Sequence, residues 1–329
     1  MIKIAFAGFR HGHINALYKL AQDNPGIEIV AAYEADDEAR AAAEKNLGVH
    51  FTHENYDDLL KDKNVDVVAV GDYFGRRGAL VIAALKAGKH VYADKPLCTS
   101  LAELDEIEKL AHKKNLKVGC MLDMRYNKFV QPVRKFIQED KLGEIHSIYF
   151  GGQHPLMYGS RPNWYFEEGK HGGTINDIAI HGIDLIEYLT GLSVKKVTGA
   201  RCWNAFATEV PSFKDCGQFM VEMSNGAGMM ADVSYAAPNS SGFTLPFYWR
   251  FTLWGTKGVM EFSYNSKDIT IALDGKPGTE IIESPDADTG DCLRVFVDEL
   301  KGKPTDIDTN TVFKATRETL KIQEYADKN

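Results

Sequence analysis

The sequence predicts a two-domain protein. We expect an N-terminal α/β domain of the doubly wound type with a parallel sheet, followed by an α+β domain with a large, mostly antiparallel open sheet. Up to about residue 122, continuously apolar runs alternate with helical segments, as a parallel sheet buried on both faces requires. Beyond it, strand-like runs are joined by turn sequences. A chain of 329 residues is also long for one hydrophobic core, so we divide it into 1–122 and 123–329.

The N-terminal elements follow in the order that βαβ units require. Gly88 is placed to end one helix, and Ser100 is placed to begin the next, with acidic residues in its first turns. We expect strands at 3–8, 28–34, 65–71, 90–96 and 117–123, and helices at 15–22, 39–45, 79–88 and 100–114.

The C-terminal elements have the pattern of a strand-rich domain. Asn225-Gly226 and the segment 255–258 each separate two strand-like runs, as hairpin turns do. A long helix near 176–189, ended by Gly191, interrupts the strands, and two more helices finish the chain. We expect a first helix at 129–139 and strands at 145–152, 195–206, 216–224, 227–236, 249–255, 258–264 and 268–273.

Composition favours a small-molecule partner. The formal net charge is −8, the pI is about 5.7, and no block of like charge stands out, which argues against nucleic acid or an anionic membrane as partner. No stretch approaches the ~20 apolar residues of a membrane span. The five cysteines are odd in number, scattered and never spaced C-x-x-C, which is typical of reduced thiols. We therefore expect a cytoplasmic protein.

The opening segment GFRHGH stands where a dinucleotide-binding loop would run Gly-x-Gly-x-x-Gly from a strand into a helix. Only Gly8 is in register, since Arg10 and His13 replace the second and third glycines. An ordinary strand-to-helix turn is the alternative. A helix N-terminus still offers N–H groups to phosphate, with Arg10 as an added cation. The candidate cofactor-binding residues of this loop are Gly8, Phe9, Arg10, His11, Gly12 and His13.

Glu34 ends the second expected strand, about 26 residues after Gly8, where an acid can hold the ribose hydroxyls of NAD. Asp36 and Asp37 follow it, and no arginine does, so a 2′-phosphate would be poorly received. The sequence thus favours NAD over NADP.

Two later stretches carry a resemblance to a known family. ALVIAALKAGKHVYADKPL (79–97) resembles the signature x-A-L-x-A-G-K-H-V-x-x-E-K-P-L of the Gfo/Idh/MocA family, named after glucose-fructose oxidoreductase, inositol dehydrogenase and the rhizopine catabolism protein. WYFEEGKHGGTINDIAIHGIDLIEYLTG (164–191) resembles its second signature, G-G-x-x-x-D-x-x-x-H-x-x-D-x-x-x-x-L-x-G. The two occur in the expected order, and the resemblance covers essentially the whole chain.

The resemblance implies a Rossmann domain followed by an open antiparallel sheet, with the nicotinamide between them. It also implies Lys95, Asp177 and His181 as the catalytic group. The chemistry agrees, because a histidine oriented by a carboxylate is a suitable base for oxidising an alcohol, and Lys95 can stabilise the developing alkoxide. Asp177, His181 and Asp184 are spaced i, i+4, i+7, so on an α-helix they would share one face.

Other interpretations of these residues stay open. Asp177 and His181 could bind a metal, but no third ligand stands at a persuasive spacing, and we predict none. His181 could be a core histidine satisfied by Asp184.

The chain also departs from the family pattern. Asp94 replaces the usual glutamate, Arg77 stands where a histidine is common, and GDYFGRRGAL replaces the usual loop after its strand. We add Asp72, Tyr73, Asp94 and Lys95 to the expected cofactor site, with Phe74 in the same loop.

The expected function is hydride transfer between NAD, or less favourably NADP, and a sugar, polyol or related hydroxy compound. Alternatives are a glycoside-cleaving enzyme that uses NAD transiently and a non-catalytic NAD-responsive regulator. We expect a homodimer or homotetramer through the C-terminal sheet. Polar and aromatic side chains that suit a sugar are expected at Arg125, Tyr126, His154, Arg161, Trp164, His171, Asp177 and His181.

Overall fold

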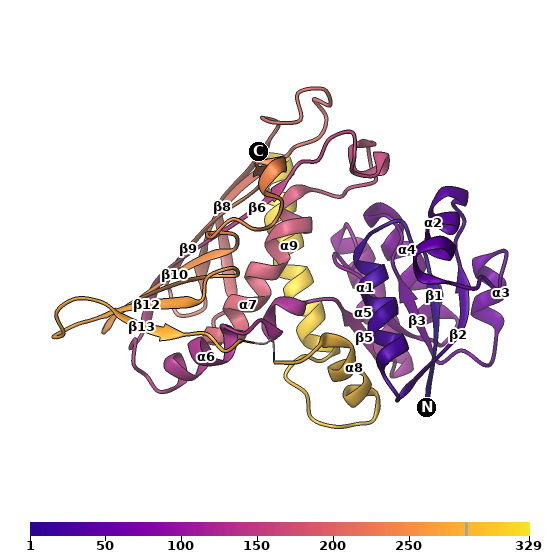
Figure 1. The fold of residues 1–329 in the computed structure, drawn as a ribbon, viewed down its shortest axis with the longest axis horizontal. Helices are drawn as coiled ribbons and strands as arrows, with labels where there is room; N and C mark the ends of the chain where they lie inside the picture. Colours follow the sequence, from indigo (N-terminus) through magenta and orange to yellow (C-terminus); the bar gives the residue numbers. More distant parts are fainter. Residues whose placement is uncertain (287–288) are drawn as a thin grey trace. The chain divides into compact units, whose positions relative to one another are not determined.

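The computed structural model describes residues 1–286 and 289–329, and the chain divides into two compact units (Figure 1). Residues 291–317 pack with residues 1–122, although the sequence pattern alone assigns them to the C-terminal domain. The first unit comprises 1–122, 169–172 and 291–317, and the second comprises 123–168, 173–290 and 318–329.

The first unit is built on the predicted parallel sheet, whose strand order is β2-β1-β3-β4-β5. Its central strand β3 (Val67–Val70) is wholly buried, as expected of a sheet covered on both faces. The other strands are β1 (Ile2–Ala7), β2 (Ile27–Tyr33), β4 (His90–Ala93) and β5 (Val118–Cys120). The helices are α1 (His13–Asp23), α2 (Asp37–Leu47), α3 (Tyr56–Lys61), α4 (Phe74–Lys86), α5 (Leu101–Lys114) and α8 (Cys292–Leu300).

The helix ends in this unit follow local chemistry. The side chain of Ser100 accepts a hydrogen bond from the backbone N–H of Glu103, which caps α5. Gly88 adopts a positive φ of 81° just after α4, as the sequence suggested. By contrast α1 begins after Gly12, which has no side chain to cap it. The first N–H groups of α1 therefore have no side-chain cap from this position.

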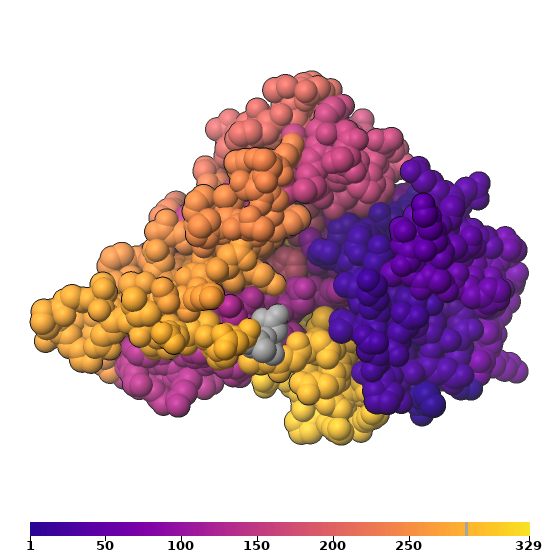
Figure 2. Space-filling view, viewed as in Figure 1, coloured from indigo at the N-terminus to yellow at the C-terminus, as the bar shows by residue number. Residues whose placement is uncertain are grey.

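The second unit is built on an eight-stranded sheet in the order β13-β12-β11-β10-β6-β9-β8-β7. Among the strand pairs of the described residues, only β6–β9 is parallel, so the prediction of a mostly antiparallel sheet is confirmed. The edge strand β13 and its neighbour β12 are orange to yellow in the space-filling view (Figure 2). The strands are β6 (Ile145–Pro155), β7 (Val194–Trp203), β8 (Cys216–Met223), β9 (Gly228–Ala237), β10 (Arg250–Gly255), β11 (Gly258–Ser263), β12 (Asp268–Leu273) and β13 (Glu280–Glu283).

The helical segments of the second unit lie before, between and after its strands. They are α6 (Val130–Gln138), α7 (Ile180–Thr190) and the last part of α9 (Thr309–Lys328), with short 3-10 turns η1 (Asp123–Tyr126), η2 (Asn163–Phe166) and η4 (Asn239–Ser241).

The helix expected near 176–189 differs from a regular α-helix. It starts with a π-helical turn, η3 (Ile175–Ala179), and only then continues as α7. A π turn is wider than an α turn, so Asp177 and His181 are not one regular α-helical turn apart. Gly182 fixes the position of α7 against β6, because a Cβ there would lie 2.4 Å from the ring of Phe150. Glycine is thus required where this helix meets the sheet.

None of the helices in the described part of the chain is long and apolar enough to span a membrane.

Candidate active site

Gly8 makes the first turn of the predicted nucleotide loop. Its φ is +87°, and a Cβ at this position would lie 2.6 Å from the backbone nitrogen of Asp72. Both the conformation and the close approach therefore require glycine. Gly12 has no such constraint, since a Cβ added there would have no atom within 4 Å, and its φ is −63°. Of the two loop glycines, only Gly8 performs the structural task that a dinucleotide loop sets.

Arg10 stands at the position of the missing second glycine and lies among acids. Its guanidinium is 3.6 Å from Glu34, 3.7 Å from Asp36 and 3.5 Å from Asp72. It also lies over the ring of Tyr73, 5.3 Å from the centroid. The loop thus places a cation directly beside the acid predicted to hold the ribose.

Glu34 directly follows β2 in a buried position, and its carboxylate accepts hydrogen bonds from the loop. It accepts hydrogen bonds from the backbone N–H groups of Phe9 and Asp36. Burial raises the pKa of Glu34, while these two hydrogen bonds act in the opposite direction. The ring of Phe9 is buried against Phe51, so Phe9 contributes its main chain to the loop and its side chain to the core. Glu34 therefore has a loop-fixing role in addition to the predicted cofactor role.

Asp72 and Tyr73 follow β3, and both are engaged by cations. The carboxylate of Asp72 accepts from its neighbour's backbone N–H and lies 3.1 Å from Arg76. The ring of Tyr73 is approached by Lys170 at 5.3 Å. These contacts hold the side chains of Asp72 and Tyr73 in place after β3, next to Gly8.

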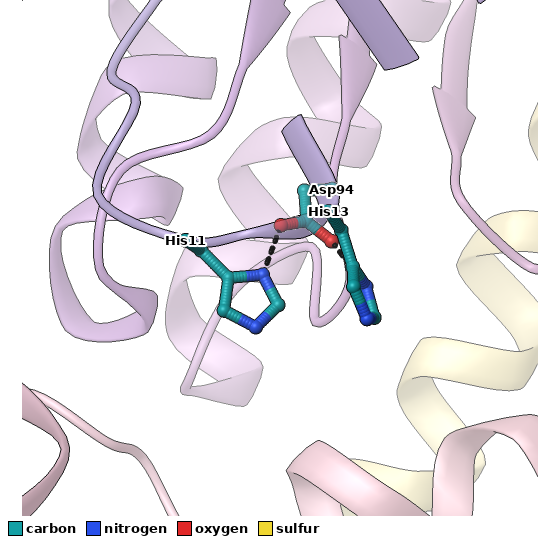
Figure 3. A group of neighbouring side chains, drawn as sticks. All are labelled: His11, His13 and Asp94. Atoms are coloured by element: carbon teal, nitrogen blue, oxygen red, sulfur yellow. Dashed lines mark hydrogen bonds and ion pairs between the residues drawn. The ribbon is translucent and has the colours of Figure 1, made fainter. Parts of the chain in front are cut away.

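Asp94 follows β4 and lies between two histidines (Figure 3). Nδ1 of His11 contacts Oδ2, Nδ1 of His13 lies 3.2 Å from Oδ1, and the buried guanidinium of Arg77 donates to Oδ2 at 3.1 Å. Although burial alone would raise it, His11, Arg77 and His13 hold the pKa of Asp94 well below its usual value. We call His11, His13 and Asp94 the His–Asp–His cluster.

The ring of Phe74 brings several predicted site residues together in the first unit. His11 lies 5.0 Å from its centroid, His171 lies 5.4 Å from it, and Nζ of Lys95 lies 5.9 Å from it. Lys95 is only 2% exposed. The ammonium of Lys95 therefore lies beside an aromatic face, where its electrostatic effect is stronger than in water.

Asp177 in η3 is paired with a residue that the sequence did not single out. The hydroxyl of Tyr235 on β9 donates to its Oδ2, and both side chains are buried. The guanidinium of Arg161 lies 5.2 Å from the Tyr235 centroid and 4.5 Å from that of Tyr165. Arg161 also donates to two backbone carbonyls, of Pro155 and Leu156, so it is held firmly in place.

His181 lies at the start of α7 against an aromatic group of the same unit. Its ring centroid is 5.9 Å from that of Trp249, and its Nδ1 is 3.8 Å from Oδ1 of Asp123. His154 lies 6.1 Å from Trp249 and 6.2 Å from Tyr235, and the hydroxyl of Tyr248 is 3.2 Å from its Nε2. The structure thus gathers Asp177, His181, His154 and Arg161 around three aromatic side chains.

Arg125 and Asp184 form a buried ion pair of their own. Nε of Arg125 donates to Oδ2 of Asp184 at 2.7 Å, and a second guanidinium nitrogen donates to Oδ1. Both carboxylate oxygens of Asp184 thus accept from Arg125. This pairing argues against the alternative in which Asp184 is the hydrogen-bonding partner of His181. The same pairing gives Arg125 a structural task between η1 and α7.

Two other predicted substrate residues lie in the second unit. Trp164 is buried and stacked on Tyr165, with centroids 4.1 Å apart. Tyr126 ends η1, and its backbone carbonyl accepts from Thr289. Packing accounts for Trp164, whereas the part-exposed ring of Tyr126 stays a prediction for substrate contact.

Sequence reasoning missed Tyr235, Tyr248 and Trp249. Tyr235 and Trp249 stand in expected strands and Tyr248 directly precedes one, and aromatic residues there are interpreted as core. A signal was present for Tyr235, because it lies on the buried face of β9 and carries a hydroxyl, which needs a partner when buried.

The first unit has the features that a nicotinamide dinucleotide needs. It offers a glycine cradle that a Cβ would fill, a helix N-terminus without a side-chain cap, and an acid at the end of β2. The second unit offers a histidine and a hydrogen-bonded carboxylate close to its aromatic residues. Such groups can move a proton and bind hydroxyls.

Two family models match the chain. Residues 2–121 match the oxidoreductase family with NAD-binding Rossmann fold, GFO_IDH_MocA, and residues 130–261 match the GFO/IDH/MocA C-terminal domain. Myo-inositol 2-dehydrogenase of Thermotoga maritima is 26% identical over 243 residues, which span 74% of this chain and 69% of that protein.

Solved structures share the fold over nearly the whole chain. An oxidoreductase of Erwinia carotovora atroseptica superimposes with a TM-score of 0.86 at 23% identity, and 99% of each chain is covered. A levoglucosan dehydrogenase in complex with NADH and levoglucosan superimposes with a TM-score of 0.80 at 19% identity, covering 99% of this chain and 97% of the other.

Proposed function

Because the chain belongs to the Gfo/Idh/MocA family of oxidoreductases, we propose that it transfers hydride between NAD and a hydroxyl-bearing carbon of a sugar, polyol or related compound. The observation that carries this proposal is the placement of Lys95, Asp177 and His181. All three are at most 6% exposed, and each lies against an aromatic ring or a hydrogen-bonding partner within its own unit. Relatives named for inositol and levoglucosan support the substrate class.

The three residues have separate roles in the proposed reaction. NAD, held at the loop around Gly8, would supply the acceptor for the hydride of the substrate carbon. His181 takes the proton of the hydroxyl group, and Lys95 stabilises the negative charge that develops on its oxygen. Asp177 accepts a hydrogen bond from the substrate or from His181. The hydrogen bond from Tyr235 fixes the orientation of the Asp177 carboxylate. In the direction of reduction, each transfer runs backwards.

The preference for NAD over NADP rests on the acids around the loop. Glu34 and Asp36 would repel a 2′-phosphate, and Arg10, the cation between them, is already balanced by these acids and by Asp72. The phosphates of the dinucleotide would lie at the N-terminus of α1, next to Gly8 and Gly12.

Association of copies through the eight-stranded sheet is part of the proposal. Exposed apolar side chains on its strands include Met220, Met230 and Trp254. Burying them against a second copy would remove apolar surface from water. A cytoplasmic location stays a prediction.

The test is a fluorescence titration of the cofactor-free protein with NADH and with NADPH. Tighter binding of NADH supports the proposed loop, and polyols and sugars are then screened for NAD reduction. Binding of neither nucleotide would overturn the proposal. Hydrolysis of a glycoside without net NADH would point instead to the glycoside-cleaving alternative. Nucleotide binding without turnover on any member of the panel would point to the regulator.

A further inference from the structure

The His–Asp–His cluster is the feature that the proposed mechanism leaves unused. Its residues come from the loop before α1 and from the end of β4, and Asp94 is fully buried. Both imidazoles approach the same carboxylate with Nδ1, and their ring centroids are 4.5 Å apart. The second nitrogen of each ring, Nε2, points away from Asp94 (Figure 3).

Hydrogen-bond accounting fixes where the imidazole protons are. An ionised carboxylate can only accept, so each Nδ1 that contacts Asp94 carries a hydrogen. A neutral imidazole has one N–H, which leaves Nε2 of that ring as an acceptor. Burial lowers the pKa of His11 to about 4, against the opposing effect of Asp94, so His11 is neutral at pH 7. Arg77 supplies the counter-charge that keeps Asp94 ionised.

A metal ion is the competing interpretation of the cluster. The ligand-type atoms of His11, His13 and Asp94 all lie within 4.8 Å of one another, and these residue types bind transition metals. Arg77, however, donates to the same carboxylate oxygen that His11 contacts. One carboxylate would then have to balance a guanidinium and a divalent cation together, which favours the hydrogen-bonded state.

We propose that Asp94 fixes the tautomer of His11 so that Nε2 of this ring is an acceptor, which makes His11, with His13 beside it, a binding site for hydroxyl groups of a ligand. An acceptor nitrogen repels phosphate oxygens and takes hydrogen bonds from O–H donors. His11 therefore does not bind the pyrophosphate, although it stands in the nucleotide loop. The hydroxyls come from the substrate or from a ribose of the cofactor, and here the inference rests on the proposed function.

The experiment records the imidazole nitrogens directly. The full chain is labelled with [¹⁵N]histidine, and a long-range ¹H–¹⁵N correlation spectrum is recorded at pH 7 without ligand. His11→Asn and His13→Asn assign the two signals, and His146→Asn, which removes an exposed histidine of β6, is the control for assignment. The expected result is a protonated Nδ1 and an unprotonated Nε2 in His11. Protonated Nε2 in His11 would overturn the proposal, whatever the enzymatic activity.

Ligand titrations identify the source of the hydroxyls. NAD⁺ alone is added first, and then a panel of polyols including myo-inositol is added to protein saturated with NADH. A shift of either Nε2 signal with NAD⁺ identifies a ribose hydroxyl, and a shift only with a polyol identifies the substrate. If Zn²⁺ at stoichiometric concentration moves the signals and none of these ligands does, the cluster is a metal site and the proposal is wrong.

Asp94→Asn tests the role of the carboxylate. An amide offers one acceptor oxygen and places an N–H group against the other imidazole, so one ring must change its tautomer. We expect the affinity for the ligand identified above to fall about tenfold, as for the loss of one hydrogen bond. Unchanged tautomers in a folded Asp94→Asn protein would contradict the proposal. If that variant does not fold, the spectrum of the unmodified protein still decides.

Discussion

The hydroxyl group of Tyr235 donates a hydrogen bond to Oδ2 of Asp177, and both side chains are buried in the second unit. Burial raises the pKa of Tyr235 well above its usual value, and the neighbouring carboxylate raises it further. Tyr235 therefore keeps its proton at neutral pH and remains a donor. The carboxylate of Asp177, proposed above as part of the catalytic group, is thus oriented from its π-helical turn by a side chain of the sheet.

Tyr235→Phe removes only this hydrogen bond, since the ring is kept. We expect kcat to fall about tenfold or more with a smaller change in KM, because Asp177 loses the hydrogen bond that orients its carboxylate. Steady-state kinetics with the best substrate of the polyol screen measures this. Tyr149→Phe, in the half-buried part of β6, is the matched control. Equal kcat in Tyr235→Phe and the unmodified protein would show that Asp177 does not need this partner.

Arg77→Met leaves Asp94 as a buried carboxylate without its guanidinium. We expect the free energy of unfolding to fall by about 3–5 kcal/mol, as for breaking a buried ion pair from one side. Arg76→Ala removes the adjacent arginine of α4, which is partly exposed, and should lower it by about 1 kcal/mol or less. Urea unfolding of both variants gives the comparison. Equal losses in the two would mean that Arg77 is not the counter-ion of Asp94.

Because of His11, the free energy of unfolding should decrease as the pH is lowered. Its pKa is 6.5 in an unfolded chain and about 4 in the folded protein, so between these values only the unfolded state takes up the proton. The His11 contribution is fully present above pH 6.5 and is lost as the pH falls towards 4. We expect it to lower the free energy of unfolding by about 2 kcal/mol between pH 7.5 and pH 5.

Urea unfolding of the unmodified protein and of His11→Gln at these two pH values isolates this contribution. The decrease should be smaller in the variant by about the same 2 kcal/mol. An identical pH dependence in both proteins would show that His11 titrates normally.

Gly8→Ala and Gly12→Ala form a matched pair in one loop. The alanine at position 8 meets the backbone of Asp72 with a positive φ, so we expect a destabilisation of about 1–3 kcal/mol and weaker NADH binding. The alanine at position 12 meets open space at a helical φ, so folding stability should be unchanged or slightly higher. Urea unfolding and NADH titration test both. Equal behaviour of the two variants would remove Gly8 from its assigned role.

The sequence was sufficient for the fold, because continuous apolar runs and turn dipeptides report local requirements of parallel and antiparallel sheets. It did not predict pairings between distant residues. Asp94 and Arg77 were noted as two separate departures from the family signature, yet in the structure they form one buried ion pair. The charge of each residue balances that of the other. Neither residue indicates this pairing by itself.

The π-helical turn was also beyond sequence reasoning. The spacing of Asp177, His181 and Asp184 suggested one face of an α-helix, but the turn at 175–179 changes the register, and Asp184 pairs with Arg125. Periodicity cannot show an inserted wide turn, because the apolar residues around it still have the pattern of a buried helix. Tyr235 was missed for a similar reason, since an aromatic residue in a strand is interpreted as core.

The most direct test of the proposed function is the kinetics of NAD reduction by the unmodified protein, Lys95→Ala and His181→Ala, using the best substrate of the polyol screen. The account predicts turnover by the unmodified protein and a loss of at least ~100-fold in kcat in each variant, with the affinity for NADH nearly unchanged. Lys135→Ala, on an exposed part of α6, should retain full activity. Undiminished kcat in either Lys95→Ala or His181→Ala would contradict the central assignment.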